Sequence, residues 1–215
     1  FYYAHHMSTI EGGMISTNDP DLYQALRMLR SHGMVREANA PELRDRYHRT
    51  HPDLNPDFIF AYPGYNVRST EINAVIGRSQ HQRLDANNEI RTRNLELFLA
   101  HLDADCYFTD FRVEGSCNYA FTLVLREADE VLCANVMEAL KASNVEFRRG
   151  TAGGGNQLRQ PYLQGLVSEV DRARFPMVDH VHFFGFYIGN YPVLEEEKIL
   201  QLCRILNDLA IGEAR

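Results

Sequence analysis

Two adjacent histidines lie near the start of the sequence, in the stretch YYAHHMSTIEGGM that spans residues 2–14. An imidazole has an ordinary pKa of about 6.5 and therefore suits a general base at neutral pH. His5 and His6 follow a short aromatic run, and five residues separate His5 from Glu11 and the two glycines after it. This arrangement predicts a histidine in a strand that ends in a tight turn. Because neighbouring residues of a strand face opposite sides, His6 would point away from the side of His5, and we expect His6 to be structural. For His5, a packing role within the strand is the alternative to that of a base.

Two arginines stand directly before a glycine-rich loop. Arg148 and Arg149 precede GTAGGGNQ, residues 150–157. Glycines let backbone N–H groups approach an anion, and the fork of an arginine binds phosphate. We therefore expect this pair to bind a diphosphate, with a flexible surface loop beside a charged edge strand as the alternative. The loop lacks the Gly-Lys-Ser/Thr ending of a nucleoside-triphosphate loop.

The spacing of the histidines and cysteines in the sequence predicts no metal site. Four histidines stand in pairs spaced by three and by two residues: His48 and His51, His180 and His182. Their neighbours do not complete a ligand set. Four cysteines are widely scattered, without a C-x-x-C pair: Cys106, Cys117, Cys133 and Cys203. We interpret them as buried thiols in a reducing cytoplasm rather than as ligands of zinc or an iron–sulfur cluster.

The composition suits one large globular domain or two small ones, with 215 residues of which 45% are hydrophobic. A net charge of -7 and a pI of about 5.7 argue against bulk attraction to nucleic acid or an anionic membrane. No apolar run approaches the roughly 20 residues that span a bilayer. No basic n-region follows Phe1, so we expect no signal peptide in this sequence. We expect a cytoplasmic protein. Because no Met begins the chain, we interpret it as the C-terminal portion of a longer protein.

The elements that would position these residues begin with two short strands within residues 1–17, around a turn at 8–13. Asn18 is a suitable N-cap for a helix over 20–32, and Gly33 is a suitable stop. Its predicted inward face consists of Leu22, Ala25, Leu26 and Leu29.

The next segment, 34–64, is rich in proline and charge and reads as a long loop. A helix over 69–84 follows, and a more charged helix over 86–102 serves as a connector. The predicted inward residues of the 69–84 helix are Ile72, Val75, Ile76 and Gln80.

Strands and helices alternate in the remainder of the chain. Strands are expected at 106–111, 118–125 and 145–149, helices at 127–143 and 195–209, and a helix followed by a strand within 175–192. This order indicates an α/β or α+β class. We expect two domains, 1–103 and 104–215.

Several short motifs, taken together, resemble the DegT/DnrJ/EryC1/StrS family of sugar aminotransferases. They run in the family's order: Phe1, Glu11-Gly12-Gly13, Thr17-Asn18-Asp19, Arg30-Ser31-His32-Gly33, Gly64-Tyr65-Asn66-Val67-Arg68 and Ile76-Gly77. Each motif is weak alone, but their order over residues 1–85 is specific. The resemblance continues more loosely after residue 105. It implies an α/β, aspartate-aminotransferase-like (type I PLP) fold, with an incomplete large domain and a small C-terminal α+β domain.

The resemblance also shows where this chain departs from the family. His5 stands where the family carries the lysine that binds pyridoxal 5'-phosphate (PLP) covalently, as the spacing to Glu11 shows. The chain has only two lysines, Lys141 and Lys198, and both fall on expected helices of the second domain. An imidazole cannot form an imine, but it can act as a base. We therefore expect non-covalent binding of PLP or of pyridoxamine 5'-phosphate (PMP).

A subgroup with this lysine-to-histidine change comprises the nucleotide-4-keto-6-deoxysugar 3-dehydratases of 3,6-dideoxysugar and O-antigen biosynthesis. The resemblance implies that PMP condenses with the sugar ketone, that His5 removes a proton and that the C3 hydroxyl leaves. L-glutamate is the implied amino donor. A CDP-sugar branch carries an iron–sulfur cluster on cysteines that follow the glycine turn, but residues 18–105 contain no cysteine. The GDP branch is therefore favoured, yet GGGNQLRQPYL (153–163) resembles the CDP branch, so the nucleotide stays open.

The resemblance implies a homodimer with a shared active site. Asn66 would reach the cofactor phosphate of the partner subunit, and Arg68 would face the same cleft. The alternative for Asn66 is a turn residue after Pro63-Gly64, and the alternative for Arg68 is a surface or interface ion pair. Two other functions remain open for the protein. One is an ordinary aminotransferase of this family, which the missing lysine disfavours; the other is an inactive paralogue used as a regulator or scaffold.

Overall fold

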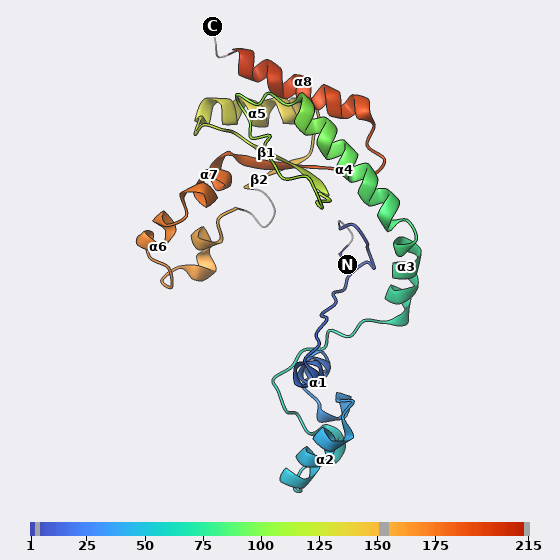
Figure 1. Ribbon diagram of the computed structural model, residues 1–215. Coiled ribbons are helices and arrows are strands. Elements are labelled where there is room, and N and C mark those ends of the chain that lie inside the picture. The colour runs from blue at the N-terminus through green and yellow to red at the C-terminus, as the bar shows by residue number, and fades with distance from the viewer. Residues whose placement is uncertain (3–4, 151–154, 213–215) are drawn as a thin grey trace. The chain divides into compact units, whose positions relative to one another are not determined.

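The computed structural model describes residues 1–2, 5–150 and 155–212 and divides into two compact units, Phe1–Gln82 and Arg83–Arg215 (Figure 1). The division falls between α3 (Glu71–His81) and α4 (Leu84–His101). Helix α4 therefore packs with the second unit, whereas the sequence interpretation assigned it to the first domain. Within the described ranges, no helix has both the length and the apolar character needed to cross a membrane.

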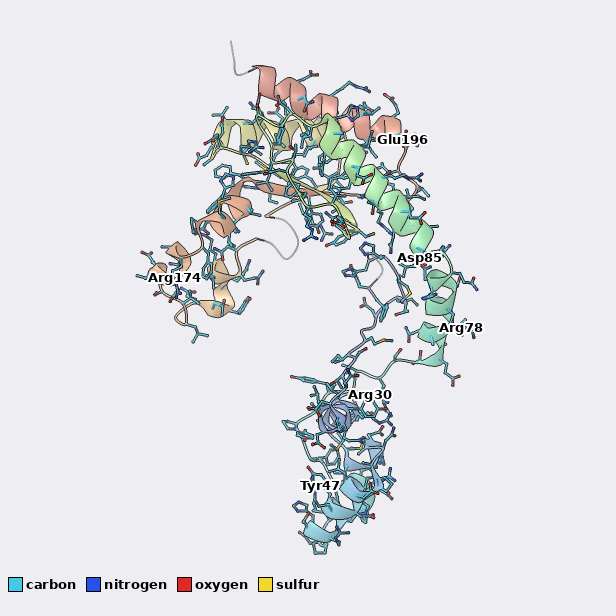
Figure 2. The ribbon with its side chains drawn as sticks, in the orientation of Figure 1. Arg30, Tyr47, Arg78, Asp85, Arg174 and Glu196 are labelled. Carbon is cyan, nitrogen blue, oxygen red and sulfur yellow. The ribbon has the colours of Figure 1, made fainter. Side chains whose placement is uncertain are left out.

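Unit 1 has a small core formed by two helices and two single turns of 3-10 helix. These elements are α1 (Pro20–Leu29), η1 (Val35–Glu37), α2 (Pro41–Thr50) and η2 (Pro56–Phe58). Its buried apolar residues are Met28, Val35, Ala38 and Ile59. Figure 2 labels Tyr47 on α2, which packs against this core together with Leu43.

The prediction of a long loop over 34–64 was wrong, because α2 lies within it. The segment PELRDRYHRT carries almost no apolar period, so its amphipathic signal is weak. Pro41 opens the helix at its first position, where a missing N–H is tolerated. Leu43 and Tyr47, four residues apart on α2, pack against the core and hold the helix there.

Helix α1 differs from its prediction at its cap and on its inward face. Asp19, not Asn18, is the N-cap, and its Oδ1 accepts from the backbone N–H groups of Asp21 and Leu22 at 2.9 and 3.0 Å. Leu22 is exposed, and Met28 is the buried residue of the helix.

The inward face predicted for α3 was also partly wrong. Ile72 and Val75 are 71% and 66% exposed. The half-buried side is formed instead by Asn73, Ile76, Gly77 and Gln80, which recur at helical spacing.

The two strands predicted within residues 1–17 do not form in the part of that segment that the structure describes. A strand needs a neighbour that satisfies its backbone groups. Here the chain turns back on itself instead, with bends at residues 5–7.

Unit 2 contains a three-stranded antiparallel sheet in the order β1-β3-β2. Its strands are β1 (Ala120–Val124), β2 (Phe147–Arg149) and β3 (Gly185–Gly189). Ile188 of β3 stands opposite both Phe121 and Phe147. These strands confirm the predictions at 118–125, at 145–149 and within 175–192.

Helices α4, α5 (Glu130–Ala142) and α8 (Glu196–Gly212) share one core with the sheet, and Figure 1 shows α5 and α8 on the same side of it. Phe98 of α4 stacks on Phe121 with ring centroids 4.6 Å apart. The helices predicted at 127–143 and 195–209 are confirmed as α5 and α8. The strand predicted at 106–111 was wrong, because only an isolated bridge between Tyr107 and Leu125 forms there.

Between β2 and β3 the chain forms short helical pieces. These are η3 (Gln157–Arg159), η4 (Pro161–Leu163), α6 (Glu169–Ala173) and α7 (Pro176–Phe184). Helix α7 contacts β2 and β3 and leads directly into β3.

Candidate functional site

His5 and His6 lie in the bent segment and differ in exposure. The His5 backbone N–H donates to the Tyr2 carbonyl at 3.1 Å, and the two rings meet edge to face at 5.9 Å. His5 is exposed, whereas His6 is half-buried. Because residues 5–7 are bent, the two-sided alternation of a strand does not separate these histidines. The two histidines differ instead in exposure, and the exposed His5 ring is accessible to a ligand.

Thr9 organises the turn that follows the histidines. It is only 8% exposed, its N–H donates to the Phe1 carbonyl at 2.9 Å, and its Oγ1 donates to the Glu11 carbonyl at 2.8 Å. Gly12 has a φ of +144°, and a Cβ there would lie 3.0 Å from Thr9 Oγ1. A Cβ on Gly13 would meet nothing within 4 Å. Of these two positions, only that of Gly12 disfavours a larger side chain, both by its φ and by its contact with Thr9.

Helix α3 holds this turn from the side. The Asn73 Nδ2 donates to the Thr9 carbonyl at 2.7 Å across 64 positions of sequence. One helical turn later, a Cβ on Gly77 would lie 3.1 Å from the Thr9 methyl group. Neither Thr9 nor Asn73 was singled out from the sequence. The Thr70-x-x-Asn73 spacing, typical of a helix N-terminus, was the one available signal.

The motifs Arg-Ser-His-Gly and Gly-Tyr-Asn-Val-Arg lie against each other because two glycines allow their backbones to meet. Gly33 has a φ of +76°, and a Cβ there would lie 1.9 Å from the Tyr62 carbonyl oxygen. A Cβ on Gly64 would lie 2.3 Å from the Gly33 nitrogen. No side chain larger than hydrogen fits at either position without a backbone shift.

Asn66 and Arg68 lie in the segment that directly follows the backbone contact at Gly64. Asn66 forms a bridge with Ser31, and the Val67 N–H donates at 2.9 Å to the carbonyl of Arg30, which Figure 2 labels at the end of α1. The Arg68 Nε donates to Asn66 Oδ1 at 3.3 Å, and both residues are exposed. The structure thus brings an amide and a guanidinium side by side on a fixed backbone.

Arg148 and Arg149 belong to unit 2. The Arg148 guanidinium lies 5.7 Å from the centre of the Tyr187 ring, and Arg149 Nη2 donates to the Phe183 carbonyl at 2.7 Å. Residues 151–154 of the predicted anion loop lie outside the described residues. The two arginines therefore already have protein contacts at the end of β2, and both stay exposed.

A polar network around Asp179 was not anticipated from the sequence. Asp179 accepts from Asn156 Nδ2 at 2.7 Å and from Arg159 Nε and Nη2 at 2.6 and 2.7 Å. The hydrogen bond from Arg159 is the main reason that the pKa of Asp179 falls to about 2. The Asn156 N–H donates to His182 Nδ1 at 3.1 Å, and Gly155, with a φ of +84°, allows this close approach. The network fixes the residues after the glycine loop onto α7.

His180 and the four cysteines are the remaining metal-binding residue types considered in the sequence analysis. His180 Nε2 lies 2.6 Å from the Leu125 carbonyl oxygen, and its ring lies 5.2 Å from that of Phe184. The four cysteines are free thiols; Cys133 and Cys203 are buried as predicted, whereas Cys106 and Cys117 are only half-buried. Burial raises the pKa of Cys203 to about 11. In the part of the chain that the structure describes, no three or more His, Cys, Asp or Glu residues form a group that could hold a metal ion.

Both lysines of the chain lie in unit 2, far along the sequence from His5. Lys141 is in the last turn of α5, and Lys198 is in the first turns of α8. Lys198 lies 3.8 Å from Glu195, with which it forms an exposed ion pair. Unit 1 contains no lysine in its sequence.

Residues 1–207 match the model of the DegT/DnrJ/EryC1/StrS aminotransferase family. The chain is 28% identical over 207 residues to a GDP-4-keto-6-deoxy-D-mannose 3-dehydratase from Yersinia pseudotuberculosis. This match covers 95% of this chain and 52% of that protein. The chain is also 27% identical over 211 residues to the protein of the same name from Escherichia coli O55:H7, with the same coverage. The chain thus spans about half the length of the curated relatives it matches.

The fold is also found among solved structures. A crystal structure of GDP-4-keto-6-deoxymannose-3-dehydratase with a trapped PLP-glutamate geminal diamine matches with a TM-score of 0.73 and 23% identity. The match covers 95% of this chain and 53% of that one. A sugar aminotransferase from Streptococcus pneumoniae in its PMP form matches with a TM-score of 0.68 and 12% identity over 91% and 46% of the two chains. The chain therefore has the fold of these aminotransferase-like proteins over about half their length.

Proposed function

Because the chain belongs to the DegT/DnrJ/EryC1/StrS aminotransferase family, we propose that the whole protein is a PLP/PMP-dependent sugar 3-dehydratase. Its substrate is a nucleotide-linked 4-keto-6-deoxyhexose, and its product serves 3,6-dideoxysugar and O-antigen biosynthesis. The observation that carries this proposal is His5, five residues before Glu11-Gly12-Gly13, in a half of the chain without lysine. Two relatives at 28% and 27% identity, both GDP-4-keto-6-deoxy-D-mannose 3-dehydratases, support it.

The residues on segment 64–68 fit the phosphate group of PLP or PMP. Asn66 offers an amide and Arg68 a guanidinium, and both are exposed on a backbone that Gly33 and Gly64 hold fixed. Donors of this kind, one of them charged, form strong hydrogen bonds to phosphate oxygens. We assign cofactor binding to Asn66 and substrate contact to Arg68.

His5 acts as the base in this proposal. The bound cofactor supplies an amine that reacts with a ketone and a ring that accepts electrons. The exposed imidazole of His5 takes up the proton whose removal allows the C3 hydroxyl to leave. Because an imidazole cannot form an imine with an aldehyde, the chain would hold the cofactor without a covalent bond. L-glutamate is the proposed amino donor.

Arg148 and Arg149 are proposed to contact the nucleotide diphosphate. They are two exposed cations at the end of β2, directly before the glycine-rich loop. The ordinary aminotransferase reaction is disfavoured because His5 stands at the position of its lysine, and the two lysines of this chain, Lys141 and Lys198, lie on α5 and α8.

Absorption spectroscopy with borohydride reduction tests this function. The holoenzyme should show a PLP band that shifts to a PMP band after L-glutamate is added. After borohydride reduction, mass spectrometry of the denatured protein should find no mass increase from attached cofactor, because His5 provides no covalent link. A stable cofactor adduct on a lysine would contradict the dehydratase proposal and favour the aminotransferase.

We also propose that the protein is a homodimer in which Asn66 serves the partner's site. Tyr65 and Val67, on either side of Asn66, are 78% and 70% exposed. Large apolar side chains that gather at one surface are typical of an interface.

A further inference from the structure

We propose that Asn73 is a positioning residue for His5, because its side chain ties the turn that follows the histidine to the start of α3. This inference rests on the function proposed for His5. It adds the residue that keeps the base in place.

The carboxamide of Asn73 uses both of its ends. Its Oδ1 accepts from the backbone N–H and the hydroxyl of Thr70 at 3.1 and 2.7 Å. Its Nδ2 donates to the Thr9 carbonyl at 2.7 Å. The opposite amide orientation would place NH₂ against an N–H donor and oxygen against a carbonyl oxygen, so the partners fix the assignment. Asn73 therefore caps α3 and holds the turn at the same time.

The tether reaches His5 through Thr9. The Thr9 N–H donates to the Phe1 carbonyl, which closes a loop of nine residues with His5 inside it. Thr9 is buried, and the absence of a side chain at Gly77 leaves room for its methyl group. Movement of Thr9 away from α3 would open this loop at its base.

The same helix end also frames the proposed cofactor-binding segment. Thr70, the N-cap of α3, follows Arg68 by two residues. Asn73 thus ties the His5 turn to the helix that continues directly from Asn66 and Arg68. Such framing matters because a displacement of about 1 Å at a reacting group can lower a rate by about 100-fold.

The substitution Asn73→Asp separates the two roles of this residue. Aspartate keeps an oxygen for the Thr70 donors but has no N–H for the Thr9 carbonyl. In the holoenzyme we expect kcat to fall by about 10- to 100-fold, with little change in KM for the nucleotide sugar. In the cofactor-free protein, hydrogen–deuterium exchange at the Thr9 amide should accelerate at least about tenfold, because its local protection depends on the closed loop.

Two control variants isolate the tether. Asn55→Asp makes the same change in charge at another cap in unit 1, where Asn55 Oδ1 accepts from the Asp57 N–H at 3.0 Å. Thr70→Ala removes the capping hydroxyl and leaves the bond from Asn73 to Thr9. Both variants should keep wild-type exchange at Thr9, although Thr70→Ala should loosen the first turn of α3.

The exchange readout separates failure of the tether from failure of the proposed function. Unchanged Thr9 exchange in Asn73→Asp overturns the inference, whatever happens to turnover. Faster exchange with normal turnover also overturns it, provided that His5→Asn abolishes turnover. If exchange accelerates and neither variant affects turnover, the tether is supported and the function proposed for His5 fails.

Discussion

At the scale of single residues, the fold makes its strongest demands at Gly33 and Gly64. Each has backbone atoms where a Cβ would lie, the Tyr62 carbonyl oxygen at 1.9 Å and the Gly33 nitrogen at 2.3 Å. Backbone atoms cannot rotate away as the end of a side chain can. Asn66 and Arg68 extend from the segment that Gly64 lets approach α1, so packing at a glycine sets the position of proposed binding residues.

We predict that Gly64→Ala destabilises the protein by about 1–3 kcal/mol, the usual effect of overpacking a tight contact. Cofactor binding should weaken as well, because Asn66 must shift with the segment. Urea unfolding followed by circular dichroism measures the first effect, and a cofactor titration measures the second.

Gly13→Ala is the matched control for this measurement. No atom lies within 4 Å of a Cβ at that position, so stability should change by no more than about 0.5 kcal/mol. Equal stabilities for Gly64→Ala and wild type would show that the two backbones are not in the contact described.

At the scale of elements, local pattern predicted unit 2 better than unit 1. Strand β1, helix α5 and helix α8 carry regular apolar periods and pack on one core, so each was found from the sequence. Helix α2 was missed because two apolar residues hold it. The strands expected before residue 17 depended on pairing partners, which no local pattern specifies.

The candidate site was predictable to the extent that motifs mark it. His5 and Asn66 were identified from the spacing and order of short motifs, and their roles stay predictions. Thr9 and Asn73 were not identified, because a hydrogen bond between residues 64 positions apart leaves no periodic signal. The cap at Asp19 was displaced by one residue from its prediction, since Asn18 and Asp19 are both good caps.

At the scale of the whole molecule, the proposed dimer predicts complementation between two inactive variants. His5→Asn should lack the base in its own site, and Asn66→Ala should disable the partner's site. In a hybrid dimer one site carries both lesions and the other carries neither. A random mixture of subunits in a two-fold dimer should therefore recover about a quarter of wild-type activity.

Co-expression of the two variants, followed by turnover assays and sedimentation analysis, measures this recovery. Each variant mixed with itself is the control and should stay inactive. If the mixed dimers recover no activity, Asn66 acts within its own subunit and the shared site is wrong.

The most direct test of the central claim is the turnover of His5→Asn in the holoenzyme, compared with that of His6→Asn. A positioned base contributes about 10²–10⁴-fold, so His5→Asn should lower turnover at least ~100-fold, with an unchanged cofactor dissociation constant. His6→Asn should have a much smaller effect, because His6 is half-buried beside the exposed His5. Near-normal turnover of His5→Asn would contradict the account, and loss of activity in His6→Asn alone would assign the base to the neighbouring histidine.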